Sequence, residues 1–221
     1  MRKKMMMPRL PGYGVLRRLV QLGLLFALTA AAPAPQKKLV WAFGDSLMAG
    51  LGLPPGQGYV PQLDAALRRS GVDAEVRNGG VSGDTAAQGR ARLLWGLRGL
   101  GWKPDLVLLE LGANDMLRGL PTDQVASNLD RILAELKRRQ IPVLIMGMRA
   151  APNLGMDYRR GFEGIYPRLA RKYGAPLYPF FLDGVAGNRS LIQADGLHPN
   201  AKGVAIVVGR TLPAVRSALR R

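Results

Sequence analysis

Residues 39–50 have the sequence LVWAFGDSLMAG, and this stretch decides the fold. The apolar run over 39–43 predicts a buried β-strand, because it is short, holds two aromatic residues and a β-branched one, and ends at a turn residue. A helical pattern resumes only near Gly58, so Ser46 is predicted to lie where a central strand passes into a loop. In open α/β sheets, ligands and reactive groups gather at that edge.

Strands and helices alternate from this point to the C-terminus. Short apolar runs predict further strands over residues 74–78, 105–111, 142–148 and 175–181. Apolar positions three or four apart predict helices over residues 59–70, 85–97, 122–140, 157–173 and 200–219, the last broken or kinked near Pro213. Crossovers of this length indicate an α/β fold, in which helices cover both faces of a parallel sheet.

The first 34 residues differ from the rest of the chain. They carry six basic residues and no acidic one, then the apolar run 19–30, then a small-residue segment up to Ala34. This order is typical of a secretory signal peptide, and the apolar run is shorter than the ~20 residues that span a bilayer. We therefore expect export to the periplasm or the medium. The alternative is an uncleaved N-terminal anchor.

The remaining residues, 35–221, are predicted to form one domain, since their number is ordinary for a single core. The chain has no cysteine, which excludes disulfides, cysteine-based metal sites and a lipoprotein anchor. The exported domain therefore has to be stabilised by its core alone.

The chain is strongly basic. Its net charge is +17, and +11 remains when the six basic residues of the leader are left out. The basic residues fall in scattered pairs without interleaved aromatic residues, a pattern that argues against nucleic-acid binding. Transient contact with an anionic membrane surface is the partner that this charge favours.

His198 is the only histidine in the protein, and it lies just before the last predicted helix. Asp195 precedes it by three residues, and Gly196 lets the backbone bend so that the carboxylate can reach Nδ1 of the imidazole. Such a bond would leave Nε2 free as a base. If an imidazole activates Ser46 as a nucleophile, that imidazole has to be His198.

A nucleophilic serine also needs hydrogen-bond donors for the oxyanion that forms when it attacks a carbonyl group. Three candidates lie at predicted strand ends: the backbone N–H of Ser46, the backbone N–H of Gly83 and the side-chain amide of Asn114. Each has an ordinary structural alternative in a turn or a loop. Their shared position at one sheet edge favours the catalytic interpretation.

These residues lie in four blocks that resemble those of the SGNH, or GDSL-type, hydrolases. The blocks occur in the family's order and span most of the chain beyond residue 34. Residues 78–85 and 165–170 are similar to the branch of periplasmic arylesterases, acyl-CoA thioesterases and lysophospholipases. Ala113 departs from that branch, which commonly has glycine there. The four blocks are GDSL at 44–47, VSGDT at 81–85, LGAND at 111–115 and DGLHPN at 195–200.

The resemblance implies a flavodoxin-like three-layer αβα sandwich with a five-stranded parallel sheet in the order 2-1-3-4-5. It implies a catalytic triad of Ser46, His198 and Asp195, an oxyanion hole of Ser46, Gly83 and Asn114, and neither metal nor other cofactor. Asp45 and Asp115 are expected to brace their loops. The Gly-x-Ser-x-Gly elbow of the α/β-hydrolases is absent.

The expected function is therefore hydrolysis of carboxylic esters or thioesters of small aryl or acyl groups or lipids, through an acyl-Ser46 intermediate. A deacetylase of carbohydrate or cell-envelope polymers is the alternative with the same chemistry. A secreted binding domain and a flavin-binding protein are the alternatives that share only the fold.

Overall fold

Five parallel strands form one sheet in the order β2-β1-β3-β4-β5, as the resemblance implied. The computed structural model describes Met1 and residues 37–221, so the predicted signal peptide lies outside the described residues. The strands are β1 (Lys38–Gly44), β2 (Ala74–Gly80), β3 (Leu106–Glu110), β4 (Val143–Met146) and β5 (Leu177–Tyr178).

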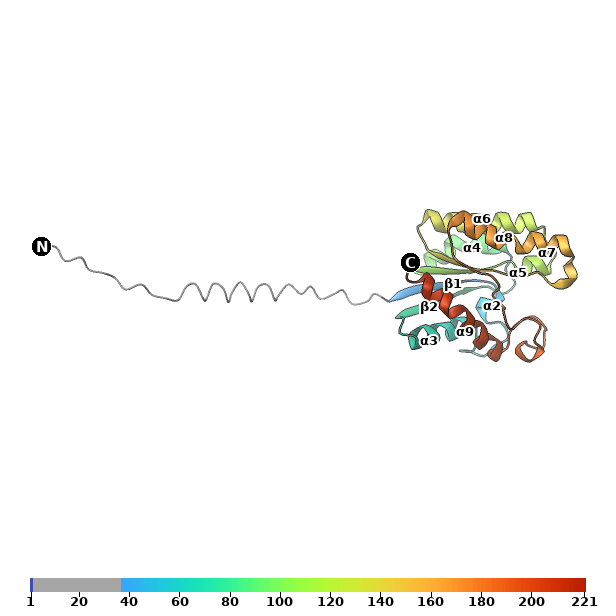
Figure 1. The fold of residues 1–221 in the computed structure, drawn as a ribbon, viewed down its shortest axis with the longest axis horizontal. Helices are drawn as coiled ribbons and strands as arrows, with labels where there is room; N and C mark the ends of the chain where they lie inside the picture. The colour runs from blue at the N-terminus through green and yellow to red at the C-terminus, as the bar shows by residue number, and fades with distance from the viewer. Residues whose placement is uncertain (2–36) are drawn as a thin grey trace. The chain divides into compact units, whose positions relative to one another are not determined.

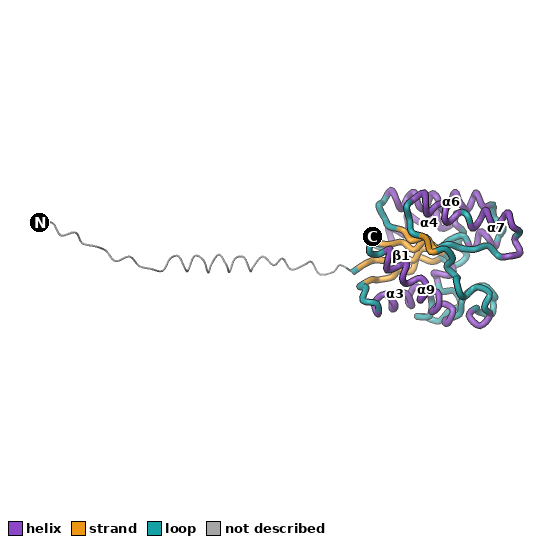
Figure 2. The backbone as a smooth tube through the Cα atoms, in the orientation of Figure 1, coloured by secondary structure: helices purple, strands orange, loops and turns teal. Residues whose placement is uncertain are grey.

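Helices cover both faces of this sheet (Figures 1 and 2). One layer holds α3 (Tyr59–Arg69) and α9 (Ala201–Ala218), which pack on each other. The other layer holds α4 (Ala86–Gly99), α6 (Thr122–Arg138), α7 (Met156–Glu163) and α8 (Ile165–Tyr173). The three-layer αβα architecture is thus confirmed.

The central strands β1 and β3 lie in the core, and all five residues of β3 are buried. They pair directly, with Gly44 opposite Glu110. Because both strands run in the same direction, their carboxyl ends meet at one edge of the sheet. The loops that follow those ends carry the residues predicted to be functional.

The short helix α2 (Ser46–Ala49) replaces the loop expected after the first strand. Asp45 caps its N-terminus, and Gly50 ends it in the left-handed conformation with φ of 80°. A second short helix, α5 (Ala113–Leu117), begins directly after Gly112. Both helices have too few residues for a hydrophobic period to show in the sequence.

Three predicted elements differ in extent. The helix expected over residues 157–173 is divided into α7 and α8 at Gly164, whose missing side chain allows the chain to pass close to the carbonyl of Arg160. The strand expected over 175–181 is reduced to β5, an edge strand of two residues. Helix α9 continues through Pro213, because Pro213 and Gly209 lie on its exposed side, where water can solvate the freed carbonyl.

No helix in the described part of the chain is both long enough and apolar enough to cross a membrane. Residues 37–221 form one compact unit.

Candidate active site

Ser46 is the first residue of α2, directly after the central strand β1. The Oδ1 atom of Asp45 accepts a hydrogen bond from the backbone N–H of Leu47 at 3.0 Å and so holds the turn that presents the hydroxyl. Ser46 is 8% exposed. Its own backbone N–H, at the start of the helix, has no protein acceptor among the described residues.

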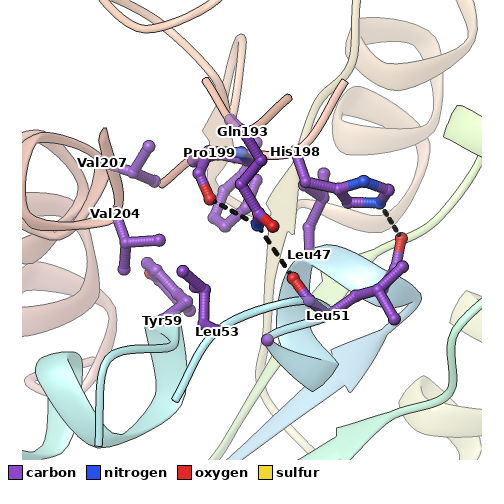
Figure 3. A pocket seen from close by; sticks show the side chains of 12 residues that line it. Leu47, Leu51, Leu53, Tyr59, Gln193, His198, Pro199, Val204 and Val207 are labelled. Carbon is purple, nitrogen blue, oxygen red and sulfur yellow. Dashed lines mark hydrogen bonds between the residues drawn. The ribbon is translucent and has the colours of Figure 1, made fainter. Parts of the chain in front are cut away.

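His198 lies beside this hydroxyl, although 152 positions separate the two residues in the chain. The Oγ atom of Ser46 is 2.8 Å from Nε2 of His198, the contact drawn as a dashed line beside His198 in Figure 3. A second and longer contact, 3.4 Å, joins Oγ to Oδ1 of Asp45. The shorter distance favours the imidazole as the acceptor of the hydroxyl proton.

Asp195 fixes the orientation of that imidazole. Its Oδ2 atom is 2.6 Å from Nδ1 of His198, and its Oδ1 atom accepts the backbone N–H groups of His198 at 3.0 Å and Leu197 at 2.9 Å. These bonds, the backbone one from His198 first, lower the pKa of Asp195 to about 2. An ionised carboxylate at Nδ1 holds a proton there and leaves the Nε2 lone pair facing Ser46.

Gly83 and Asn114 line the same cavity as Ser46 and His198. Gly83 has φ of +86°, a conformation that favours glycine, and its backbone N–H has no acceptor within the described chain. Its carbonyl accepts a hydrogen bond from Nη2 of Arg118 at 2.8 Å, which holds this peptide in place.

The amide of Asn114 is already engaged. Its Nδ2 atom donates to Oδ2 of Asp45 at 3.0 Å and to the carbonyl of Asp84 at 3.1 Å. An amide nitrogen has two hydrogens, so both donors are used. Donation to a bound oxyanion therefore requires one of these bonds, of which that to Asp84 is the longer, to be exchanged.

Asp45 is buried at the centre of the site and has no solvent-exposed surface. It accepts hydrogen bonds from the backbone N–H of Leu47 and the amide of Asn114, and its Oδ1 atom lies 3.4 Å from the hydroxyl oxygen of Ser46. Burial raises its pKa, and the bond from Leu47 opposes that shift. Because Ser46 and Asn114 both contact this one carboxylate, their relative positions depend on it.

A second carboxyl group, that of Glu110, lies beneath Asp45 at the end of β3. Its Oε2 atom accepts the backbone N–H of Asp45 at 3.3 Å, and the residue is fully buried. Burial and the neighbouring charge of Asp45 raise the pKa of Glu110 well above its usual value. Glu110 is the only acid in the apolar run of residues 106–111, and this break in the pattern is the sequence signal that the predictions left unused.

Asp115 braces the neighbouring loop. Its Oδ2 atom accepts the backbone N–H of Ala86, the first residue of α4, at 2.8 Å. Burial raises the pKa of Asp115. Thr85 completes the N-terminus of this helix as a capping box with Gln88.

The cavity beside Ser46 has a volume of about 760 Å³. Large apolar side chains form much of its wall, which suits an apolar ligand. These side chains come from α2, α5 and the loops after β4 and β5: Leu47, Leu117, Met148, Leu182, Ile192 and Leu197. Among the residues with described positions, His, Asp and Glu side chains form no cluster of three or more that could hold a metal ion.

Known proteins are similar to this chain over most of their length. The sequence pattern of the GDSL-like lipase/acylhydrolase family matches residues 42–206. The arylesterase of Vibrio mimicus is 43% identical over 182 residues, which are 82% of this chain and 89% of that protein. The thioesterase 1/protease 1/lysophospholipase L1 of Escherichia coli K12 is 37% identical over 80% of this chain and 81% of that protein.

A solved structure is similar as well. The crystal structure of AlinE4, an SGNH-hydrolase family esterase, is 51% identical, with a TM-score of 0.72 over 84% of this chain and 98% of that chain. The family match over residues 42–206 includes all four sequence blocks. The chain belongs to the GDSL-like lipase/acylhydrolase family and is a hydrolase of carboxylic esters.

Proposed function

We propose that the chain cleaves esters and thioesters through an acyl-Ser46 intermediate, with His198 as the base and Asp195 as the residue that orients it. The observation that carries this proposal is the 2.8 Å contact between Oγ of Ser46 and Nε2 of His198, with Asp195 bound to the opposite ring nitrogen. This is the geometry that a serine nucleophile and its base require.

In the first half of the reaction, Nε2 of His198 takes the hydroxyl proton while Oγ of Ser46 attacks the carbonyl carbon. The carbonyl oxygen becomes an oxyanion. The protonated imidazole then gives its proton to the departing alcohol or thiol as the bond to the acyl carbon breaks. In the second half, His198 takes a proton from water as the water oxygen attacks acyl-Ser46, and the imidazolium then returns this proton to Oγ as the bond to the acyl carbon breaks and the acid leaves.

The backbone N–H groups of Ser46 and Gly83 are proposed to stabilise the oxyanion, since neither has a protein acceptor within the described chain. Asn114 is proposed as the third donor, turning from the carbonyl of Asp84 to the oxyanion while its bond to Asp45 persists. Preorganised donors of this kind supply a large share of catalysis in acyl transfer.

The proposed substrates are small aryl and acyl esters, thioesters and lipids with one reacting acyl chain. The apolar side chains of the cavity can accept such a chain, and they favour it over the polar ring of an O-acetylated sugar. The names of the relatives, an arylesterase and a thioesterase/lysophospholipase, support the same class.

Replacement of Ser46 by alanine should abolish turnover. We expect Ser46→Ala to lower kcat with p-nitrophenyl butyrate by ~10⁶, because no other group supplies the attacking oxygen. Ser127→Ala, at an exposed position on α6, is the matched control and should retain full activity. Turnover by Ser46→Ala within tenfold of the parent protein would refute the assignment.

Replacement of Asn114 by alanine should lower kcat by ~10²–10³ and leave KM nearly unchanged, because the lost bond forms to the transition state. Asn128→Ala removes an amide that donates only to the carbonyl of Gln124 within α6, and it should leave kcat unchanged. A change confined to KM in Asn114→Ala would contradict the proposed role.

Replacement of Asp195 by asparagine should lower kcat by ~10⁴, because the imidazole is no longer held with its proton on Nδ1. Folding lowers the pKa of the Asp195 carboxyl from ~4 to about 2. The ionised carboxylate therefore orients His198 fully above pH ~4, and this contribution is lost only as the pH falls toward 2. The ionisation of Asp195 should therefore not limit the rate above pH ~4. Asp183→Asn, which breaks an exposed pair with Arg210, is the control.

We also propose that residues 1–34 direct export and are removed. Their basic, apolar and small-residue segments support this. Expression of the full chain in a Gram-negative host should yield periplasmic or secreted protein whose intact mass shows cleavage between residues 31 and 35. Leu24→Arg, within the apolar segment, should block export. A full-length chain that stays in the cytoplasm would overturn the proposal.

A further inference from the structure

Residues 191–200 form a hairpin that carries His198, and backbone hydrogen bonds join its two arms. The N–H of Gln193 donates to the carbonyl of His198 at 2.8 Å, and the N–H of Asn200 donates to the carbonyl of Leu191 at 2.9 Å. Ile192 and Pro199 form an isolated antiparallel bridge between these bonds. The hairpin therefore holds its internal shape, but these bonds do not fix its position relative to Ser46.

Only two hydrogen bonds join the fully described segments 45–58 and 189–200. One is the contact between Ser46 and His198. The other runs from Nε2 of Gln193 to the carbonyl of Leu51, in the loop after α2, at 2.9 Å (Figure 3). The same Nε2 donates to the carbonyl of Pro199, next to His198, also at 2.9 Å. One side-chain amide thus binds both loops.

We propose that Gln193 is a positioning residue, whose carboxamide sets the distance between His198 and Ser46 by bridging the carbonyls of Leu51 and Pro199. This inference rests on the proposed roles of Ser46 and His198. The bond between those two residues cannot serve this purpose throughout, since Oγ loses its proton and is acylated during the reaction. The bonds of Gln193 involve no reacting atom and persist through both halves.

Gly52 allows the carboxamide to come this close. A Cβ atom on Gly52 would lie 2.2 Å from Oε1 of Gln193, so a larger residue would displace the amide. Gly52 has φ of +74°. Gly56, in the same loop, has φ of +84°, but a Cβ atom there would meet no described atom within 4 Å. Gly56 therefore has a positive φ like that of Gly52, but a Cβ atom there would make no contact with Gln193.

The first test replaces Gln193 by methionine, which keeps the length of the side chain but cannot donate. We expect Gln193→Met to lower kcat with p-nitrophenyl butyrate by ~10–100-fold with KM changed less than about twofold, because a small displacement of the base acts on the chemical step. Gln124→Met makes the same exchange at an exposed position on α6 and should leave kcat unchanged. Both are assayed well below their melting temperatures.

The second test uses the fact that His198 is the only histidine. Its imidazole signals in a ¹⁵N-histidine-labelled sample need no further assignment, and in Gln193→Met they should shift or broaden although the protein stays folded. Gly52→Ala should reproduce the loss of kcat, while Gly56→Ala, which also places alanine at a positive φ, should not.

Wild-type kcat in Gln193→Met, unchanged imidazole signals, or equal losses in Gly52→Ala and Gly56→Ala would each overturn the inference. Failure of the proposed function is recognised separately, because Ser46→Ala would then remain active whatever Gln193 does.

Discussion

The site depends on one buried carboxylate, that of Asp45. It has no contact with solvent, it accepts hydrogen bonds from the backbone of Leu47 and the amide of Asn114, and it lies beside the hydroxyl of Ser46. A buried carboxylate is tolerated only when donors surround it. Asp45 therefore draws β1, α2 and α5 together, and the same bonds that satisfy its charge fix a proposed nucleophile and a proposed oxyanion donor.

Glu110 places a second buried carboxyl group beside that of Asp45. Two carboxyl groups lie together in the core, and burial raises the pKa of both. Asp45 has several donors, whereas one backbone N–H donates to Glu110, so the charge is better placed on Asp45 and the proton on Glu110. The end of β3 thereby supports the turn before Ser46 without adding a second negative charge beneath it.

The sequence predicted the sheet and its edge well because both depend on periodicity. Apolar runs separated by amphipathic helices require a parallel sheet, and a parallel sheet brings the carboxyl ends of its strands together. Residues as distant as Ser46 and His198 could therefore be assigned to one place. The break between α7 and α8 was missed, since the apolar stripe continues past Gly164 and only close backbone contact there ends the first helix.

Local hydrogen bonds were harder to predict. Helix α2 has four residues, so Asp45 and Gly50 were its only sequence signals. The engagement of both Asn114 donors follows from the position of the Asp84 carbonyl, which no composition or spacing reveals. Gln193 lies beside a recognised block, but its bond to Leu51 crosses 142 positions and depends on the absence of a side chain at Gly52.

The two halves of the site are held by different physical means. Ser46 and Asp45 are buried at the end of a central strand, where packing fixes their positions. Asp195 and His198 lie on a surface hairpin, and the side chain of Asp195 is 42% exposed. Leu191 and Ile192 of that hairpin pack against the core, but the segment that carries Asp195 is exposed, so its alignment with Ser46 also needs directional bonds between loops. The sheet brings the two halves to the same edge, and hydrogen bonds such as those of Gln193 set the final distance between hydroxyl and imidazole.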